Sequence, residues 1–268
     1  MKKTEMRNEK TYALDKMSAL EIVRVMNDED KTVAYAVEKA LPQIAQAVEN
    51  VVDSFERGGR LLYVGAGTSG RLGVLDASEC PPTYGVSSDM VVGIIAGGYR
   101  TLTNAAENAE DNAASGMLDA RNANVNEKDT IVGISVAGDA EYVYSALSYA
   151  KAVGAKIVAL TCNADAKISS VADITILTDT GAEVVTGSTR LKAGTAHKMV
   201  LNMLSTAAMV RTGKVIENLM INLSPTNIKL RDRSIRIVCE LTDLTYEQAA
   251  EKIDSGLSIK EIVKGNRS

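Results

Sequence analysis

The sequence predicts an α/β protein in which helices cover both faces of a parallel sheet and extend beyond it at both ends of the chain. Five short apolar runs between residues 60 and 177 carry this prediction, because each is typical of a buried strand and helical segments separate most of them. Before and after these runs, apolar residues recur every three or four positions, which is the spacing of a helix that buries one face.

The first sixty residues are predicted to be helical. Ser18 can cap a first helix, and Glu21 stands three residues later, as in a capping box. A second apolar stripe runs over residues 32–55 with helical spacing, and Pro42 within it marks either a kink or a new helix start. The pair Gly58-Gly59 ends this stripe.

The predicted strands are rich in Val, Ile and Leu, and several run directly into glycines. They cover residues 60–65, 90–96, 130–135, 156–161 and 173–177. Helical patterns occupy residues 102–121 and 141–153, with a short one after Asp165. Strands that alternate with helices form parallel sheets, and such sheets bind ligands at the carboxyl ends of their strands.

Beyond the last strand the chain is predicted to be helical again. A long helix is expected over residues 189–212, and Pro225 then breaks the chain. Further helices are expected over residues 228–241 and 247–253, followed by a short terminal one. We therefore expect an N-terminal helical segment that packs on the core, a sheet domain and a C-terminal helical region, over residues 1–57, 58–215 and 216–268.

Charge and composition exclude several classes of function. The 268 residues include 30 Lys and Arg against 34 Asp and Glu, a net charge of −4, which argues against nucleic-acid binding. No apolar run reaches the ~18–20 residues of a membrane span. The charged N-terminus lacks the apolar stretch of a secretory signal, so we expect a cytoplasmic protein.

Cysteine and histidine are too few for a disulfide framework or a metal cluster. The three cysteines, Cys80, Cys162 and Cys239, are odd in number and far apart. The single histidine, His197, excludes a multi-histidine metal site. Because it lies in an Ala-rich helical segment, we expect His197 to be a packing or interface residue rather than a catalyst. No metal and no cofactor are expected.

The densest motif is Gly65-Ala-Gly-Thr-Ser-Gly70-Arg-Leu-Gly73, directly after the first strand and at the start of a helix. Glycines let backbone N–H groups approach a ligand closely, and a helix N-terminus favours an anion. The glycine spacing suits a dinucleotide, but the second strand ends in Ala96-Gly97-Gly98 without the acid that such a site needs. The hydroxyls of Thr68 and Ser69 favour a sugar or sugar phosphate. A plain tight turn is the alternative.

Glutamates at two places are candidate acids or bases. Glu79 precedes Pro81-Pro82, which is expected to end its helix, and the negative end of a helix dipole raises the pKa of a carboxyl as a general acid requires. From composition alone, a solvated glutamate is the preferred interpretation. Glu107 and Glu110 share one face of the next helix, which is otherwise an ordinary charged surface.

The last motif is Thr186-Gly-Ser-Thr-Arg-Leu-Lys-Ala-Gly-Thr-Ala-His-Lys198, at the start of the long helix. Its hydroxyls, together with Arg190 and Lys192, are placed to attract a carboxylate or a phosphate to the helix N-terminus. A capped surface helix is the alternative.

Together these strings resemble the N-acetylmuramic acid 6-phosphate etherase family. The resemblance rests on the segments 65–85, 95–98, 107–111, 186–198 and 214–227, and on Thr4-Glu-Met-Arg-Asn8 near the N-terminus. It covers nearly the whole chain. It implies a sugar isomerase (SIS) domain, a three-layer α/β/α sandwich that binds phosphosugars, which agrees with the strand and helix pattern.

The family is a lyase of cell-wall sugar recycling that removes D-lactate from the C3 ether of its substrate and adds water, without metal or nucleotide. The resemblance implies Glu79 as the acid that protonates the departing ether oxygen and Glu110 as the base that takes the C2 proton. It also implies a homodimer. With the hydroxyl-rich and glycine-rich motifs above, it predicts that a phosphorylated amino sugar is bound by Gly67, Thr68, Ser69, Ser135, Gly138, Ser188, Thr189 and Lys192.

The loop after the third strand departs from the usual SIS form Ser-x-Ser-Gly-x-Thr. Here it is Ser135-Val-Ala-Gly-Asp-Ala-Glu141, so two hydroxyls are lost and Asp139 stands where the family usually has a basic residue. Loss of two charge-assisted hydrogen bonds weakens phosphate binding by about 100-fold. Three functions therefore stay open: an etherase with altered phosphate recognition, a related lyase for another sugar, and a catalytically silent sugar-phosphate sensor.

Overall fold

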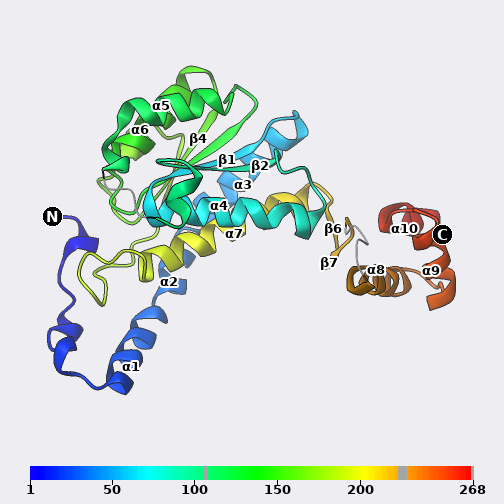
Figure 1. Ribbon diagram of the computed structural model, residues 1–268, viewed down its shortest axis with the longest axis horizontal. Helices are drawn as coiled ribbons and strands as arrows, with labels where there is room; N and C mark the ends of the chain where they lie inside the picture. Colours follow the sequence, from blue (N-terminus) through cyan, green and yellow to red (C-terminus); the bar gives the residue numbers. More distant parts are fainter. Residues whose placement is uncertain (105–107, 223–227, 267–268) are drawn as a thin grey trace.

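The computed structural model describes residues 1–104, 108–222 and 228–266. In this part of the chain, a five-stranded parallel sheet lies between two layers of helices, which confirms the predicted α/β/α architecture (Figure 1). The sheet has the order β2-β1-β3-β4-β5. Its strands are β1 (Leu61–Gly65), β2 (Val91–Ile95), β3 (Thr130–Ile134), β4 (Lys156–Thr161) and β5 (Ile174–Leu177).

The strand order reverses between β1 and β3. Gly65 pairs with Ile134, so these two strands end level with each other at the carboxyl edge of the sheet. The chain then leaves β1 for one face of the sheet and β3 for the other. Diverging connections of this kind leave a crevice at the edge of the sheet, where α/β proteins bind their ligands.

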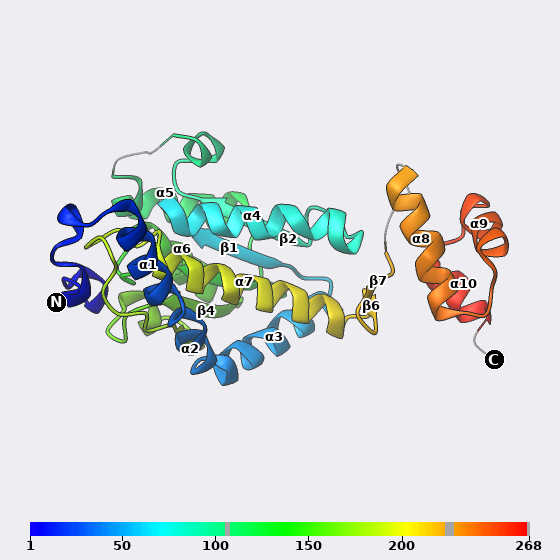
Figure 2. The same ribbon diagram turned by 90° about the horizontal axis from the view of Figure 1, so that it is seen from below.

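Alternation along the strands sends side chains to two separate cores. Leu61 and Tyr63 of β1 point into the first core, whereas Leu62 and Val64 point into the second. Helices α3 (Leu41–Glu56), α4 (Gly67–Tyr84) and α7 (Lys192–Arg211) cover the first face, and α4 runs beside α7 (Figure 2). Helices α5 (Ala113–Asn122) and α6 (Glu141–Ala152) cover the second.

The N-terminal part is helical, as predicted. Helix α1 (Ala19–Asp30) begins with the predicted capping box, in which the Ser18 backbone N–H donates to Glu21 Oε2 at 2.7 Å. Pro42 lies in the first turn of α3, so it marks a new helix start after α2 (Val33–Glu38) rather than a kink. Before α1, residues 1–17 form an N-terminal strap. The strap contains three short 3₁₀ turns, η1 (Lys3–Glu5), η2 (Glu9–Thr11) and η3 (Leu14–Lys16).

The C-terminal part has a small core of its own. After a hairpin of β6 (Val215–Ile216) and β7 (Leu219–Met220), helices α8 (Ile228–Leu241), α9 (Tyr246–Asp254) and α10 (Ile259–Asn266) pack on one another. This three-helix unit lies beyond the hairpin, away from the sandwich (Figures 1 and 2). The helices match the prediction closely. The hairpin was not predicted, because two-residue strands show no periodicity.

The helix predicted over residues 102–121 is wrong in its first half. The structure has 3₁₀ turns η4 (Tyr99–Leu102) and η5 (Ala109–Asp111) there, and α5 begins only at Ala113. Asn108 takes a left-handed backbone conformation, with φ 60°, which no helix continues through. The Asn112 side chain then caps α5 by accepting the Ser115 N–H at 3.0 Å. Glu107 lies outside the described residues.

The expected helix stop at Pro81-Pro82 is also wrong. Helix α4 continues through both prolines to Tyr84 and ends at Gly85, which has φ 60°. The prolines cost the helix two N–H donors. Packing offsets this loss, because Cys80 and Tyr84 are buried and the Tyr84 hydroxyl lies 3.1 Å from Thr206 Oγ1 on α7. Glu79 is therefore in the penultimate turn of α4, not at its negative end.

Candidate active site

A cavity of about 400 Å³ opens at the carboxyl ends of β1 and β3, at the point where the strand order reverses. Its size suits a small ligand such as a sugar phosphate. Five segments contribute: the start of α4, the loop after β3, η5, the loop before α7 and the N-terminal strap. The lining residues are Glu5, Ala66, Gly67, Thr68, Ser69, Glu110, Asp111, Ile134, Ser135, Val136, Ala137, Asp139, Ala140, Gly187 and Thr189.

The glycine motif forms a tight connection between β1 and α4. Gly67 has φ +53°, and a Cβ on Gly70 would come within 2.6 Å of the Gly65 carbonyl oxygen. These glycines therefore bring the first turn of α4 against the end of β1. Thr68 and Ser69 lie in that turn and line the cavity. Because the first-turn N–H groups of a helix lack partners within the helix, this end of the cavity favours an anion.

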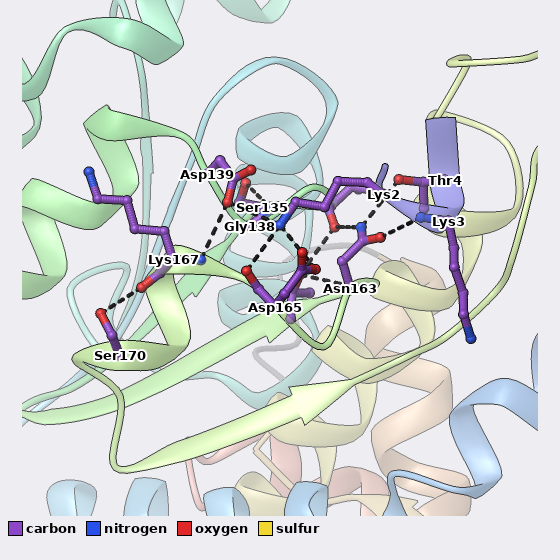
Figure 3. A network of polar contacts seen from close by, with 12 residues as sticks. Lys2, Lys3, Thr4, Ser135, Gly138, Asp139, Asn163, Asp165, Lys167 and Ser170 are labelled. Atoms are coloured by element: carbon purple, nitrogen blue, oxygen red, sulfur yellow. Dashed lines mark hydrogen bonds and ion pairs between the residues drawn. The ribbon is translucent and has the colours of Figure 1, made fainter. Parts of the chain in front are cut away.

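The loop after β3 forms another part of the cavity wall. Gly138 has φ +85°, and its N–H donates to Ser135 Oγ at 3.1 Å, which leaves the Ser135 hydroxyl proton available to a ligand. Asp139 lines the cavity, and its carboxylate accepts from Lys2 Nζ at 3.2 Å and from the Lys167 N–H at 3.4 Å (Figure 3). The predicted phosphate loop is thus part of the cavity wall, with an acid in it.

Carboxylates dominate the charged lining. Glu110 lines the cavity together with Glu5, Asp111 and Asp139, and no Lys or Arg lines it within the described residues. Glu5 and Asp111 were not among the sequence candidates. Glu5 reaches the cavity because the N-terminal strap crosses the loops at the carboxyl edge of the sheet. No local sequence pattern reveals this path. The site therefore offers acids and hydroxyls for proton transfer.

The start of α7 does not act as the predicted anion site. The Glu183 carboxylate already occupies it, accepting the backbone N–H groups of Lys192 at 3.0 Å and Ala193 at 2.9 Å. Of the residues predicted there, Thr189 lines the cavity, whereas Ser188 and Lys192 do not. Lys192 is buried, and its Nζ lies 2.6 Å from Glu29 Oε2 on α1.

Glu29 joins α1, the strap and α7. Its carboxylate also accepts from Lys10 Nζ at 2.7 Å and from Asn8 Nδ2 at 2.9 Å. Burial of Glu29 by itself raises its pKa, but the hydrogen bonds from Lys10, Lys192 and Asn8 outweigh burial and lower the pKa to about 2. The ordinary value is 4.5, so this carboxylate stabilises the fold fully above that pH, and the contribution is lost as the pH falls toward 2.

We expect Glu29→Gln to lower the free energy of unfolding by about 3 kcal/mol at pH 7, because it leaves the Lys192 ammonium buried without a counter-ion. Part of the stability loss of the unmodified protein between pH 4.5 and 2 should be missing in this variant. Urea unfolding at pH 7 and at pH 3 measures both effects. The control is Glu49→Gln, since Glu49 pairs with Arg211 on the surface. Equal losses in the two variants at pH 7 would contradict the prediction.

Glu79 does not line this cavity. It lies on the exposed side of α4, twelve residues after Gly67. At 1.5 Å rise per residue, that is about 18 Å along the helix from Gly67 and about 15 Å from Ser69, the last residue of α4 that lines the cavity. One turn earlier, the buried Asp76 accepts from Tyr63 Oη at 2.8 Å and Asn202 Nδ2 at 2.6 Å, which fixes this part of α4 against β1 and α7.

His197 is fully buried and away from the cavity. Its Nε2 lies 3.4 Å from Cys162 Sγ, and burial lowers the pKa of the ring to about 3, so it is neutral at pH 7. This is the environment of a packing residue. Within the described residues, no group of three or more His, Cys, Asp or Glu side chains is placed to hold a metal ion. Over the same ranges, no helix is long and apolar enough to span a membrane.

Proteins with similar sequences include several N-acetylmuramic acid 6-phosphate etherases. The chain is 53% identical to the N-acetylmuramic acid 6-phosphate etherase of Photobacterium profundum over 246 residues, which cover 92% of this chain and 82% of that protein. It is 54% identical to the Bacillus cereus protein of the same name over 248 residues, which cover 92% of this chain and 84% of that protein. The chain belongs to the N-acetylmuramic acid 6-phosphate etherase family.

Further comparisons place this etherase-family chain in the SIS fold. Residues 43–151 match the family model of the glucokinase regulatory protein N-terminal SIS domain. A putative phosphosugar isomerase from Bacteroides fragilis superimposes with a TM-score of 0.56 at 21% identity, covering 75% of this chain and 95% of that one. A phosphoheptose isomerase from Francisella tularensis superimposes with a TM-score of 0.51 at 21% identity, covering 72% of this chain and 100% of that one. At such identities the likeness shows a shared fold, which confirms the predicted one.

Proposed function

We propose that the protein cleaves the C3 lactyl ether of N-acetylmuramic acid 6-phosphate, giving D-lactate and N-acetylglucosamine 6-phosphate in cell-wall sugar recycling. The observation that carries this proposal is the position of Glu110. In a chain of the etherase family, it lines the cavity at the reversal of strand order, together with Asp111 and with Thr68 and Ser69. A cytoplasmic location follows from a substrate that is a phosphorylated metabolite.

The reaction is an elimination followed by a hydration, catalysed by a base and an acid. Glu110, as base, takes the C2 proton of the open-chain aldehyde, and the C1 carbonyl delocalises the resulting carbanion as an enolate. The enolate electrons form the C2–C3 double bond while the C3–O bond breaks, and the acid protonates the departing lactate oxygen. Water then adds at C3 and a proton returns to C2. These steps require two carboxyl groups and no electron transfer, so we assign a carbon–oxygen lyase that works without metal.

The phosphate is assigned to the end of the cavity between α4 and the loop after β3. The first-turn N–H groups of α4 and the hydroxyls of Thr68, Ser69 and Ser135 are the donors there. Thr189 faces the same cavity and is assigned to the sugar hydroxyls. Lys192 is left out of the binding set, because its ammonium is already paired with Glu29.

The acid requires a second copy of the chain. Carboxyl groups that flank one sugar bond lie about 5–10 Å apart, but Glu79 is about 15 Å along α4 from the last residue of that helix in the cavity wall of its own chain. We therefore propose a homodimer in which Glu79 of the partner subunit reaches the cavity that holds Glu110. In support, Glu79 lies on the exposed side of α4 next to Leu75, whose side chain is 50% exposed and is a candidate for burial in a dimer interface.

D-lactate release from N-acetylmuramic acid 6-phosphate by the purified protein tests the proposed activity. We expect release with and without EDTA, and much less from the unphosphorylated sugar. Absence of release from both sugars would contradict the etherase. Release from the unphosphorylated sugar alone would indicate a related lyase for another substrate.

A catalytically silent sugar-phosphate-binding regulator is the second candidate. Two observations favour it: the match to the glucokinase regulatory protein model and the acid at position 139 in the phosphate loop. Calorimetry with N-acetylglucosamine 6-phosphate distinguishes the two functions when it is combined with the lactate assay, since a regulator binds the sugar phosphate without any turnover of the muramic acid ether.

A further inference from the structure

This inference rests on the proposed function and concerns the way in which the cavity tolerates the substrate phosphate. A phosphate monoester carries −1.5 to −2 charges at pH 7. Asp139 lies in the loop to which the phosphate is assigned, and no basic side chain lines the cavity within the described residues. An uncompensated carboxylate at this place repels the phosphate and weakens binding. The protein therefore needs a cation that acts on Asp139.

Lys2 is placed to do this. Its Nζ lies 3.2 Å from Asp139 Oδ1, 3.2 Å from Asp165 Oδ1 and 3.1 Å from the Asp165 carbonyl oxygen. The Lys2 side chain is 17% exposed and that of Asp139 is 53% exposed, so water reaches the carboxylate and screens this ion pair in part. Figure 3 shows the ammonium between the loop after β3, which carries Asp139, and the loop after β4, which carries Asp165.

The position of Lys2 is fixed by its neighbours. The backbone N–H of Lys3 donates to Asn163 Oδ1 at 3.0 Å, and Asn163 Nδ2 donates to Thr4 Oγ1 at 3.2 Å. Thr4 and Asn163 are both buried, and buried polar groups keep their hydrogen-bond partners. Lys3 and Thr4, which follow Lys2, thus attach the strap to the loop after β4. Glu5, the residue after Thr4, reaches the cavity.

We propose that Lys2 determines phosphate specificity by offsetting the charge of Asp139. In this chain, the cation that the loop itself lacks comes from the N-terminal strap, 137 residues away in the sequence. Lys2 acts through Asp139 rather than on the reacting atoms, so it is a positioning residue. Loss of its charge leaves one carboxylate uncompensated beside the phosphate, which we expect to weaken substrate binding about tenfold.

The test compares Lys2→Met with Lys3→Met. Lys3 is the matched control, because it is the next residue of the strap and pairs with Asp179, which does not line the cavity. Any purification tag is placed at the C-terminus. We expect Lys2→Met to raise KM for the phosphorylated substrate about tenfold with little change in kcat. Lys3→Met should leave both nearly unchanged, and melting temperatures show whether both variants stay folded.

A second comparison isolates Asp139. In an Asp139→Asn background, Lys2→Met should raise KM less than about twofold, because the carboxylate of this ion-pair group that lines the cavity is gone and Asp165 does not line it. An equal rise in both backgrounds would overturn the proposal, as would a Lys2→Met variant that behaves like Lys3→Met. The Kd of N-acetylglucosamine 6-phosphate repeats the comparison without turnover. If the unmodified protein releases no lactate, the etherase fails while this Kd still tests the role of Lys2. If it binds no sugar phosphate at all, the role of Lys2 fails as well.

Discussion

Replacing Glu110 with Gln is expected to slow D-lactate release by about 10³-fold, within the 10²–10⁴ range that a positioned base contributes. Proton removal from C2 is the first chemical step, so the exchange of this proton with D₂O should be lost together with lactate release. Glu79→Gln should differ, because an acid that protonates the leaving oxygen acts after C2 deprotonation. This variant should lose lactate release and keep the exchange.

Proton NMR of the substrate in D₂O follows both signals in one sample, as the C2–H resonance disappears and free lactate appears. Glu127→Gln is the matched control, since Glu127 is exposed and does not line the cavity. Exchange at the unmodified rate in Glu110→Gln would refute the assignment of Glu110 as the base. Loss of exchange in Glu79→Gln would mean that the two roles have been assigned the wrong way round.

The sheet could be predicted from the sequence because its strands are buried on both faces and therefore show as continuous apolar runs. The connection from β2 to α5 could not. Its conformation depends on single residues, such as Asn108 with its positive φ and the cap at Asn112, which leave no periodic signal. The prolines of α4 misled the prediction, because the packing of Tyr84 on α7 keeps the helix going past them.

Parts of the candidate site that directly follow a strand could also be predicted. Gly67, Ser69 and Ser135 follow β1 and β3, and parallel strands bring their carboxyl ends together. The pairing of charges could not be predicted, because partners are far apart in the sequence. Lys192 meets Glu29 across 163 residues and Lys2 meets Asp139 across 137. Only the path of the N-terminal strap and α1 decides that Lys192 is paired away from the cavity while Lys2 is placed beside Asp139 in its wall.

The largest gain in activity is expected from mixing two inactive variants. Glu79→Gln and Glu110→Gln each have both sites of a homodimer disabled. If every site uses Glu110 of one chain and Glu79 of the partner subunit, a mixed dimer contains one intact site and one doubly altered site. Random assortment makes half of the dimers mixed, so the mixture should recover about 25% of the unmodified activity.

Co-expression of the two variants, or joint unfolding and refolding, produces the mixed dimers, and gel filtration establishes that dimers form. The mixture of Glu79→Gln with unmodified protein is a control for simple dilution. If both glutamates of a site came from the same chain, a mixed dimer would have one altered residue in each site, and the mixture would stay as inactive as its parents. Because Glu79 lies about three helical turns from the cavity of its own chain, an inactive mixture would contradict the assignment of the partner subunit's Glu79 as the acid.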